Sequence, residues 1–311
     1  MTDAPDITSM KRVTDLHDAP ADVLTTAVDA AVQSADAAAN AAGVTVRELR
    51  DLDALDGVYR LYDEIWRPDP SNPPVTTELM RALTKAGNYV AGAFDGDKLV
   101  GACVGFFGAP ADEAMHSHIA GVSAGMRGRN VGFALKLHQR AWALLQGVSE
   151  IAWTFDPLIC RNAYFNVAKL GACVSEYLPN FYGGMHDSIN AGDDTDRVLI
   201  RWPLTAPAVV AACAGVVQHT DAAAARAAGA ALALGTSADG GPVAGPADAA
   251  TLLVAVPPDI ESLRSSAPAL AREWRAAVRE VLVAQLAAGA RVTGFDRAGW
   301  YVLAAGEGEQ R

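Results

Sequence analysis

The sequence predicts a mixed α/β (α+β) fold, in which short strands form a sheet and helices flank it. Apolar and polar residues alternate over several short runs, which is typical of half-buried strands. Between these runs apolar residues recur every three or four positions, as on one face of a helix. The sequence Asp-Gly-Asp-Lys at residues 95–98 separates two apolar runs and is typical of a hairpin, so part of the sheet is expected to be antiparallel.

The first 43 residues are rich in Ala, Asp and Thr, and they predict a partly mobile leader that ends in a loosely packed helix over Ala21–Ala42. A regular pattern follows over residues 44–204. The strands predicted in it are Val44–Leu49, Tyr89–Phe94, Leu99–Phe107, Met115–Val122, Ile151–Phe155, Ala172–Leu178 and Thr195–Trp202. The helices predicted in it are Asp51–Ile65, Thr77–Lys85, Gly132–Leu145 and Asn162–Leu170. Pro68 ends the first of these helices and Gly171 the last.

The C-terminal third of the chain has a different pattern. Residues 205–250 are Ala-rich and predict a helix over Ala208–Ala233, followed by a flexible link that contains Gly, Ser and Pro. Residues 251–311 predict a β-α-β-β extension. Its strands are expected at Thr251–Val256, Val292–Phe295 and Trp300–Leu303, and its helix at Asp259–Ala288 with a break at Pro268. Because this extension is too small for an independent enzyme, we expect it to pack on the region 44–204.

Composition limits the classes of function. With 311 residues, 51% of them hydrophobic, the chain can bury a large core in one domain plus an extension, or in two domains. The net charge of −11 disfavours a nucleic-acid partner, because phosphate backbones are bound by basic surfaces. No run approaches the ~18 apolar residues of a membrane span, and the cysteines show no C-x-x-C spacing. These observations, with the lack of a signal pattern, predict a soluble cytoplasmic protein that has no membrane partner.

The most informative segment joins the predicted strand Met115–Val122 to the predicted helix Gly132–Leu145. A basic, glycine-containing turn before a helix is an anion site, because the first N–H groups of the helix have no partner and the helix dipole adds positive charge. Gly128 and Gly132 let the backbone approach a phosphate, and Asn130 tolerates the left-handed conformation. We therefore predict that this loop binds a pyrophosphate, the alternative being an ordinary helix start.

Two familiar phosphate loops do not fit this segment, since there is no G-x-x-x-x-G-K-S/T and the glycines do not follow G-x-G-x-x-G. Its spacing resembles the coenzyme A pyrophosphate loop of the GNAT superfamily of acyl-CoA-dependent acyltransferases. The family signature R/Q-x-x-G-x-G/A falls on Arg127, Asn130 and Gly132, with Asn in place of the usual Gly. The order of the predicted elements over residues 44–204, β-α-α-β-β-β-loop-α-β-α-β-β, is also similar to that of the family.

The resemblance implies a GNAT-like fold, with a mixed, mostly antiparallel sheet whose fourth and fifth strands splay apart to hold pantetheine. It implies acetyl-CoA or another acyl-CoA as co-substrate, and a backbone N–H of the fourth strand at the thioester carbonyl. The cofactor-binding residues expected on this basis are Gly121, Val122, Arg127, Gly128, Arg129, Asn130, Val131, Gly132, Asn162 and Asn166. Gly121 and Val122 are the alternatives for the strand N–H, and the two asparagines are expected to bond the pantetheine amides.

Two histidines of the predicted strand Met115–Val122 are candidates for the general base. His116 and His118 alternate onto one face of the strand together with Ala120 and Val122. An imidazole, with a usual pKa of about 6.5, can accept a proton from an ammonium through water. We favour His118 because it is nearer the loop, although either histidine can equally be a structural residue.

The general acid is less well defined. The family commonly places a Tyr shortly before the Lys-x-Gly end of its last core helix, and this position holds Val167 here. Tyr164, one turn earlier, is the candidate donor to the departing thiolate, although it can equally be a packed ring. Among the other titratable groups, Glu113 is a weaker candidate for the base, and His138 is interpreted as structural.

Residues that contact the acceptor are expected after the predicted strand Ile151–Phe155 and in a polar loop. Asp156 is either an anchor for the incoming ammonium or a solvated carboxylate that caps the turn before Pro157. The loop over residues 182–197 contains Gly and polar residues, and such loops often carry specificity. The candidates in that loop are His186, Asp187, Asn190 and Arg197. Arg161 is a second arginine that can bind an acceptor carboxylate.

The sequence therefore predicts an acyl-CoA-dependent N-acyltransferase that moves an acetyl or succinyl group to a primary amine of a small molecule, such as an amino acid, by direct transfer in a ternary complex. Segments 153–158, 161–171 and 182–190 look like a poorly characterised GNAT branch with the same C-terminal extension, some members of which are associated with N-succinylation of amino acids. The alternatives are a catalytically silent acyl-CoA-binding module and a protein-lysine acetyltransferase. No metal site is predicted, because no histidine pair has ligand spacing, and a homodimer is left open.

Overall fold

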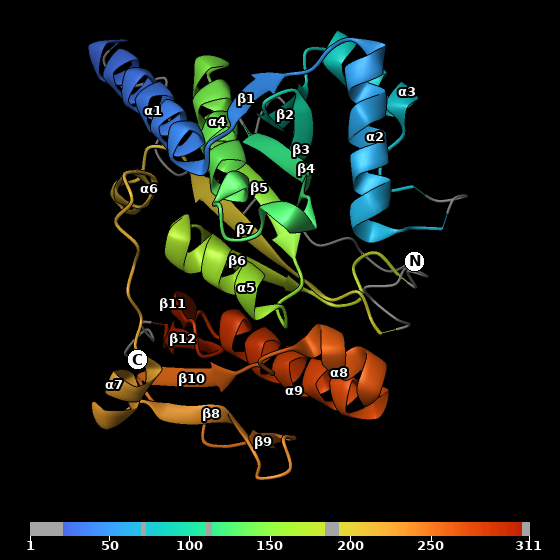
Figure 1. The fold of residues 1–311 in the computed structure, drawn as a ribbon. Helices are drawn as coiled ribbons and strands as arrows, with labels where there is room; N and C mark the ends of the chain where they lie inside the picture. The colour runs from blue at the N-terminus through green and yellow to red at the C-terminus, as the bar shows by residue number, and fades with distance from the viewer. Residues whose placement is uncertain (1–20, 70–72, 110–113, 184–192, 307–311) are drawn as a thin grey trace, which may run out of the picture.

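The computed structural model describes residues 21–69, 73–109, 114–183 and 193–306, and arranges them around two sheets (Figure 1). The first sheet has the strand order β1-β2-β3-β4-β5-β7-β6. Its strands are β1 (Thr45–Glu48), β2 (Tyr89–Asp95), β3 (Lys98–Phe107), β4 (Ala114–Val122), β5 (Glu150–Phe155), β6 (Cys173–Leu178) and β7 (Arg197–Pro203). All neighbours in this sheet are antiparallel except β4 and β5. The predicted mixed α/β class, with a mostly antiparallel sheet, is confirmed.

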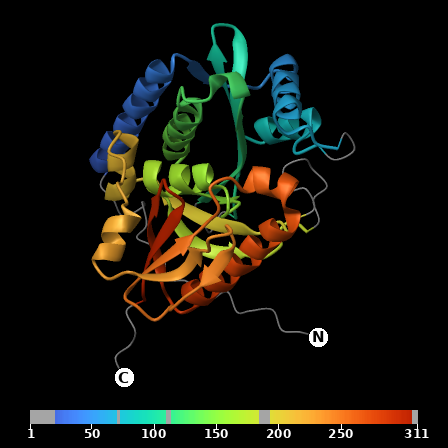
Figure 2. The same cartoon turned by 60° about the horizontal axis from the view of Figure 1, so that its bottom comes forward.

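Helices cover both faces of the first sheet (Figure 2). On one face, α1 (Ala21–Ala42) lies along α4 (Val131–Leu145), and on the other α2 (Leu52–Trp66) packs with α3 (Thr77–Lys85). The bounds of α1 are those predicted, but the helix is not loosely packed, because Ala31 is fully buried and lies in the same core as α4. Small alanine side chains let two helices approach closely, and the rest of the predicted leader lies outside the described residues.

The two parallel strands pair over only three positions. Residues 114–116 of β4 lie opposite residues 150–152 of β5, and beyond this point the two strands continue without pairing. The predicted splay between the fourth and fifth strands is therefore present. It opens at the carboxyl ends of both strands, which is where open sheets with parallel strands commonly bind ligands.

The helix that follows β5 changes its winding. It begins as α5 (Cys160–Ala163) and continues as the π-helical turn η5 (Tyr164–Lys169), in which Leu170 donates its N–H to the Phe165 carbonyl five residues back. Such π-turns are rare and occur frequently at functional sites. Gly171 follows at φ +66°, a left-handed conformation that suits glycine and ends the helix as predicted.

The second sheet has the order β11-β12-β10-β8-β9 and lies below the first in Figure 1. Its strands are β8 (Ala231–Thr236), β9 (Pro242–Ala244), β10 (Thr251–Ala255), β11 (Arg291–Asp296) and β12 (Trp300–Ala304). The helices of this part are α6 (Pro207–Cys213), α7 (Ala222–Ala227), α8 (Ile260–Ser266) and α9 (Pro268–Ala287). The predicted break at Pro268 separates α8 from α9. Figure 1 shows α9 running between the two sheets.

The prediction for residues 205–250 is wrong. The expected helix Ala208–Ala233 is two short helices and the start of β8, and the expected link is the hairpin between β8 and β9. Gly215 and Gly229 interrupt the helix at φ +92° and +101°, and a run rich in alanine does not by itself distinguish a helix from a buried strand. Within the described ranges, no helix is both long and apolar enough to cross a membrane.

Candidate functional site

The loop after β4 has the geometry of an anion site. After a short 3₁₀ turn at Ala124–Met126, Gly128 has φ +83° and Asn130 has φ +60°, so Asn130 adopts the predicted left-handed conformation. Within the residues that the structure describes, the backbone N–H groups of Gly128, Asn130, Val131 and Gly132 have no hydrogen-bond partner. These donors lie at the positive end of the α4 dipole and are free to bind a ligand.

Arg129 does not contribute its side chain to that anion site. Its guanidinium donates to the Asp95 carboxylate at 2.8 Å and to the backbone carbonyl groups of Ala42 and Gly43 at 3.1 and 3.2 Å. Arg129 therefore ties the end of α1 and the β2–β3 turn to the loop. This corrects the expectation for Arg129, because the sequence does not show that the ends of α1 and the hairpin turn meet the loop.

Arg127 and Lys169 bring positive charge to the same loop. Arg127 is exposed and has no partner in the described part of the chain, and a cavity of about 500 Å³ opens beside it, with residues 159–161 and 258–262 as its other walls. Lys169, at the end of η5, donates to the Asn130 side chain at 2.8 Å. Lys169 was not predicted as a site residue from the sequence, because only the fold brings the end of this helix to the loop.

The free edge of β4 faces the splay beyond the last β4–β5 pair. Ser123 donates its N–H to the Val100 carbonyl, and Gly121 lies opposite Ala102 in the β3–β4 register. Because bonded and non-bonded pairs alternate along an antiparallel ladder, the N–H of Gly121 is directed to β3 and that of Val122 to the splay. Of the two expected backbone donors, Val122 is therefore the one available. Gly121 instead makes room for α2, since a Cβ there would lie 2.6 Å from a ring atom of that helix.

A β-bulge at His118 sets the direction of the histidines. The β3–β4 register skips His118, so the alternation of faces shifts at this residue. His116 and His118 still share one face, with ring centroids 6.1 Å apart and Phe106 beside both. Val122, by contrast, packs with the core that contains α4, on the opposite face. The expectation that Ala120 and Val122 lie on the histidine face is therefore wrong, because it assumed unbroken alternation.

The two histidines differ in exposure. His118 is exposed, whereas burial, followed by the nearby His118 and Lys136, lowers the pKa of His116 to about 4. The His116 imidazole is consequently neutral at pH 7 and a weak base. His138 faces the core, where its Nδ1 lies 2.8 Å from the Tyr89 hydroxyl, in agreement with the structural role expected for it.

A buried lysine lies at the closed end of the splay. The Lys136 ammonium donates to Ser117 Oγ at 2.8 Å and to Gln139 Oε1 at 3.0 Å, and it lies 3.6 Å from the centroid of the Trp153 ring. Ser117 and Trp153 directly follow the last paired residues of β4 and β5. Lys136 is 4% exposed and forms no ion pair within the described residues, so burial lowers its pKa to about 8. The position of Lys136 among the apolar residues of α4 is the feature of the sequence from which a buried lysine could have been predicted.

The helix after β5 carries the remaining candidates for binding the cofactor and donating a proton. Asn166 is buried and Asn162 half-buried, and neither side-chain amide has a hydrogen-bond partner among the described residues. Both amides are therefore available to a ligand. Val167 is buried in the main core, so packing fills the position at which the family commonly has Tyr. The Tyr164 ring packs against the same core, and its hydroxyl has no partner in the described ranges.

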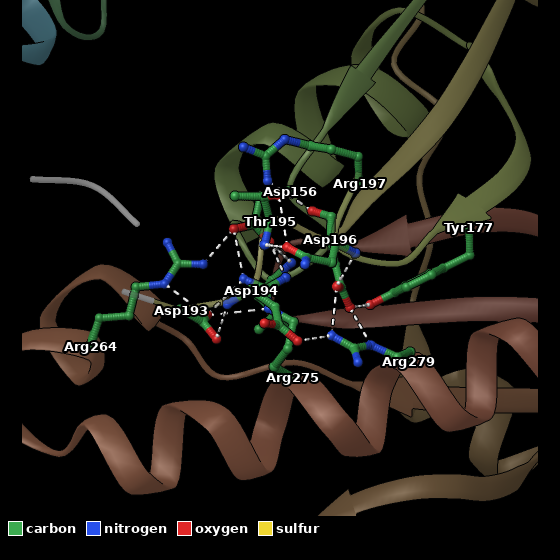
Figure 3. Close-up of polar contacts among 12 residues, drawn as sticks. Asp156, Tyr177, Asp193, Asp194, Thr195, Asp196, Arg197, Arg264, Arg275 and Arg279 are labelled. Atoms are coloured by element: carbon green, nitrogen blue, oxygen red, sulfur yellow. Dashed lines mark hydrogen bonds and ion pairs between the residues drawn. The ribbon is translucent and has the colours of Figure 1, made fainter. Parts of the chain in front are cut away.

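Asp156 lies in a buried ion-pair network that joins the first sheet to α8 and α9 (Figure 3). The Arg275 guanidinium binds both Asp156 oxygens at 2.8 and 3.0 Å, Arg264 binds one of them, and the two arginines also pair with Asp193. Burial alone would raise the pKa of Asp156, but Arg275 and Arg264 outweigh it and hold the pKa below its usual range. Asp156 is therefore neither solvated nor free to anchor an ammonium.

A neighbouring part of the network engages the end of β6. The Asp196 carboxylate accepts from the Tyr177 hydroxyl at 2.6 Å and from Arg279 at 2.7 and 2.8 Å. Arg197 points to the other side, donates to the Asp196 carbonyl, and lies 5.3 Å from the Tyr182 ring. The network therefore binds α9 to the first sheet.

The remaining acceptor candidates lie outside the described residues or in an ion pair. His186, Asp187 and Asn190 lie outside the described residues, as does Glu113. Arg161 forms a two-bond ion pair with Glu261 of α8 and is not free. Within the described ranges, no group of three or more His, Cys, Asp or Glu side chains is arranged to hold a metal ion.

Neither a protein-family model nor a curated protein sequence matches the chain. Among solved structures, it is similar to an N-acetyltransferase from Staphylococcus aureus, with 15% identity, a TM-score of 0.42, and coverage of 52% of this chain and 99% of the other. It is also similar to a GNAT-family acetyltransferase from Streptococcus pneumoniae, with 13% identity, a TM-score of 0.42, and coverage of 51% and 97%.

A candidate acetyltransferase from Salmonella typhimurium, solved with its cofactor acetyl-CoA, shows 16% identity, a TM-score of 0.43, and coverage of 53% and 98%. Each of these proteins thus matches about half of this chain over nearly its own full length. The first sheet has the mostly antiparallel order and the splayed β4 and β5 that were expected from the sequence.

Proposed function

We propose that the chain is an acyl-CoA-dependent N-acyltransferase that transfers an acetyl or succinyl group directly to a primary amine of a small molecule, such as an amino acid. One observation carries this proposal: backbone N–H groups without a partner in the described residues, at the start of α4, lie next to the splay between β4 and β5. A pyrophosphate is bound well by such a helix start, and an extended thioester arm fits between two separating strands. Acyl-CoA contains both groups in one molecule.

The chemistry follows from the groups around the splay. The Val122 N–H is the donor for the thioester carbonyl, where negative charge develops as the amine attacks. The exposed His118 accepts the proton of the incoming ammonium through water, and the Tyr164 hydroxyl protonates the thiolate as the C–S bond breaks. The buried Cys103 is a poor nucleophile because burial raises the pKa of its thiol, which favours direct transfer over an acyl-enzyme.

A catalytically silent acyl-CoA-binding module is the second candidate. The observation that favours it is the burial of Val167, which leaves the family's usual position for the acid without a hydroxyl. Both candidates share the donor site and differ only in turnover. Release of free CoA from acetyl-CoA and succinyl-CoA, measured with D- and L-amino acids, polyamines and basic peptides, separates them and identifies the acceptor class. Turnover with basic peptides alone would favour a protein-lysine acetyltransferase instead.

The donor site is tested by calorimetry of CoA binding to Gly132→Glu, with Gly132→Ala as the matched control. A Cβ at Gly132 meets only a Val122 methyl group, at 3.8 Å, so the Cβ that both variants add is accommodated without strain. The carboxylate of Gly132→Glu would repel the pyrophosphate and occupy its place, and we expect CoA binding to weaken by about 2–4 kcal/mol. Gly132→Ala should bind CoA nearly as the unchanged protein does. Equal affinities for Gly132→Glu and the unchanged protein would refute the donor site.

A further inference from the structure

Two cations from distant parts of the chain meet beside the start of α4. Lys169, at the end of η5, donates to the side chain of Asn130, which precedes the first residue of α4. Arg297, in the turn between β11 and β12, holds its guanidinium 4.7 Å from the centroid of the Tyr164 ring, on the same helical segment as Lys169. The C-terminal part of the chain therefore contributes a charged side chain to the neighbourhood of the pyrophosphate loop.

Among the described residues, no carboxylate balances these two charges. Neither Lys169 nor Arg297 forms an ion pair within the described residues, although the chain has a net charge of −11. Burial, followed by repulsion from the nearby Arg297, lowers the pKa of Lys169. Placing like charges together costs free energy unless a bound anion offsets it.

Other arginines between the first sheet and the C-terminal part differ from Arg297, because they form ion pairs. Arg264, Arg275 and Arg279 of α8 and α9 all pair with aspartates between residues 156 and 196, and Arg161 pairs with Glu261. Those side chains satisfy one another and hold the two parts together. Arg297 contacts the Tyr164 ring and, in the part of the chain that the structure describes, forms no ion pair, so its charge does not hold the two parts together.

We propose that Lys169 and Arg297 bind the phosphate groups of acyl-CoA together with the free N–H groups at the start of α4. The C-terminal part then supplies a residue of the donor site rather than only packing against it. This inference rests on the proposed function, because it assigns further residues to the same site. The Tyr164 ring supports the Arg297 guanidinium by stacking, which leaves the donor N–H groups at its edge free for phosphate oxygens.

The experiment compares CoA binding by calorimetry in the full-length protein and in Lys169→Gln, Arg297→Gln and Arg297→Lys. Arg291→Gln, at the other end of β11, is the matched control, since it removes the same charge from the same hairpin at another exposed position. Charge-assisted bonds to phosphate are among the stronger polar contacts, so we expect each Gln variant to weaken CoA binding at least about tenfold. Arg297→Lys should bind CoA less tightly than the unchanged protein but more tightly than Arg297→Gln, because lysine keeps the charge and loses the stacked, planar donor group. Arg291→Gln should retain the full affinity.

A second measurement separates phosphate binding from a structural role. S-acetyl-pantetheine carries the thioester but no phosphate, so kcat/KM for this donor should be the same in Arg297→Gln and the unchanged protein, while kcat/KM for acetyl-CoA falls. Unaltered CoA affinity in Arg297→Gln, or an equal loss with both donors, would overturn the inference. If the unchanged protein does not bind CoA, the proposed function itself fails. If it binds CoA and only Gly132→Glu weakens binding, the proposed function stands and this inference fails alone.

Discussion

The buried Lys136 makes a quantitative prediction about stability and pH. The residue is 4% exposed, and its ammonium forms no ion pair with a carboxylate among the described residues. The ammonium contacts Ser117 Oγ, Gln139 Oε1 and the Trp153 ring. Replacing it in Lys136→Met keeps a chain of similar length and removes the charge. The two oxygen acceptors lose a donor in the variant, which lowers its stability by an amount that does not depend on pH near neutrality.

The size and sign of the pH effect follow from the pKa. The folded protein releases the Lys136 proton near pH 8, whereas an exposed lysine keeps it to pH 10.5. Between these values the unfolded chain binds more protons, so the stability of the unchanged protein rises with pH. One pKa unit corresponds to about 1.4 kcal/mol, and the whole penalty below pH 8 is therefore about 3 kcal/mol. Between pH 7 and pH 10 about 2–3 kcal/mol of it should disappear.

Urea denaturation of both proteins at pH 7, 8, 9 and 10 measures this effect. The free energy of unfolding of Lys136→Met minus that of the unchanged protein should fall by about 2–3 kcal/mol across the series. Lys98→Met, which alters an exposed lysine in the β2–β3 turn, is the control and should give a constant difference. A difference for Lys136→Met that is the same at every pH would refute the reasoning.

Three further predictions concern catalysis and packing. His118→Ala should lower kcat about 10²-fold near neutral pH and less at high pH, where the amine is already neutral; an equal loss at every pH would indicate a structural role. Tyr164→Phe should reduce kcat about 10- to 10²-fold with little change in acyl-CoA affinity, and a wild-type kcat would exclude Tyr164 as the proton donor. Arg275→Met leaves Asp156 and Asp193 buried with one arginine fewer, so urea denaturation should show a loss of about 3–5 kcal/mol, whereas Arg291→Met should lose almost nothing.

The local sequence pattern was sufficient to predict most strands of the first sheet and the helices that cover it. The residues Asp51 and Thr76 accept N–H groups at the starts of α2 and α3, and the hairpin after β2 turns where Asp-Gly-Asp-Lys predicts it. These elements form where sequence periodicity, caps and turns agree. The region 205–250 was predicted wrongly because alanine carries a weak periodic signal, and β8 is a strand that pairs with both β9 and β10.

In the candidate site, too, local features could be predicted from the sequence and long-range contacts could not. The anion loop could be predicted because its requirements are local, namely a basic turn, an Asn at φ +60° and a helix start. The direction of His116 and His118 could not, since one bulge residue reverses the alternation of faces. Asp156 was expected at an open site, and the fold places two arginines from more than a hundred residues away on its carboxylate.

By itself the sequence determined the α/β class, the order of elements over residues 44–204 and the turn before α4 with its left-handed Asn130, because each depends on neighbouring residues and their backbone preferences. Only the tertiary structure decided which charges are available. Arg129 and Asp156 form ion pairs with residues distant in sequence, whereas Lys169 and Arg297 contact only Asn130, Phe133 and Tyr164 and form no ion pair within the described residues. The physical reason is that a charged side chain interacts over a few ångströms of space, whatever its separation along the chain.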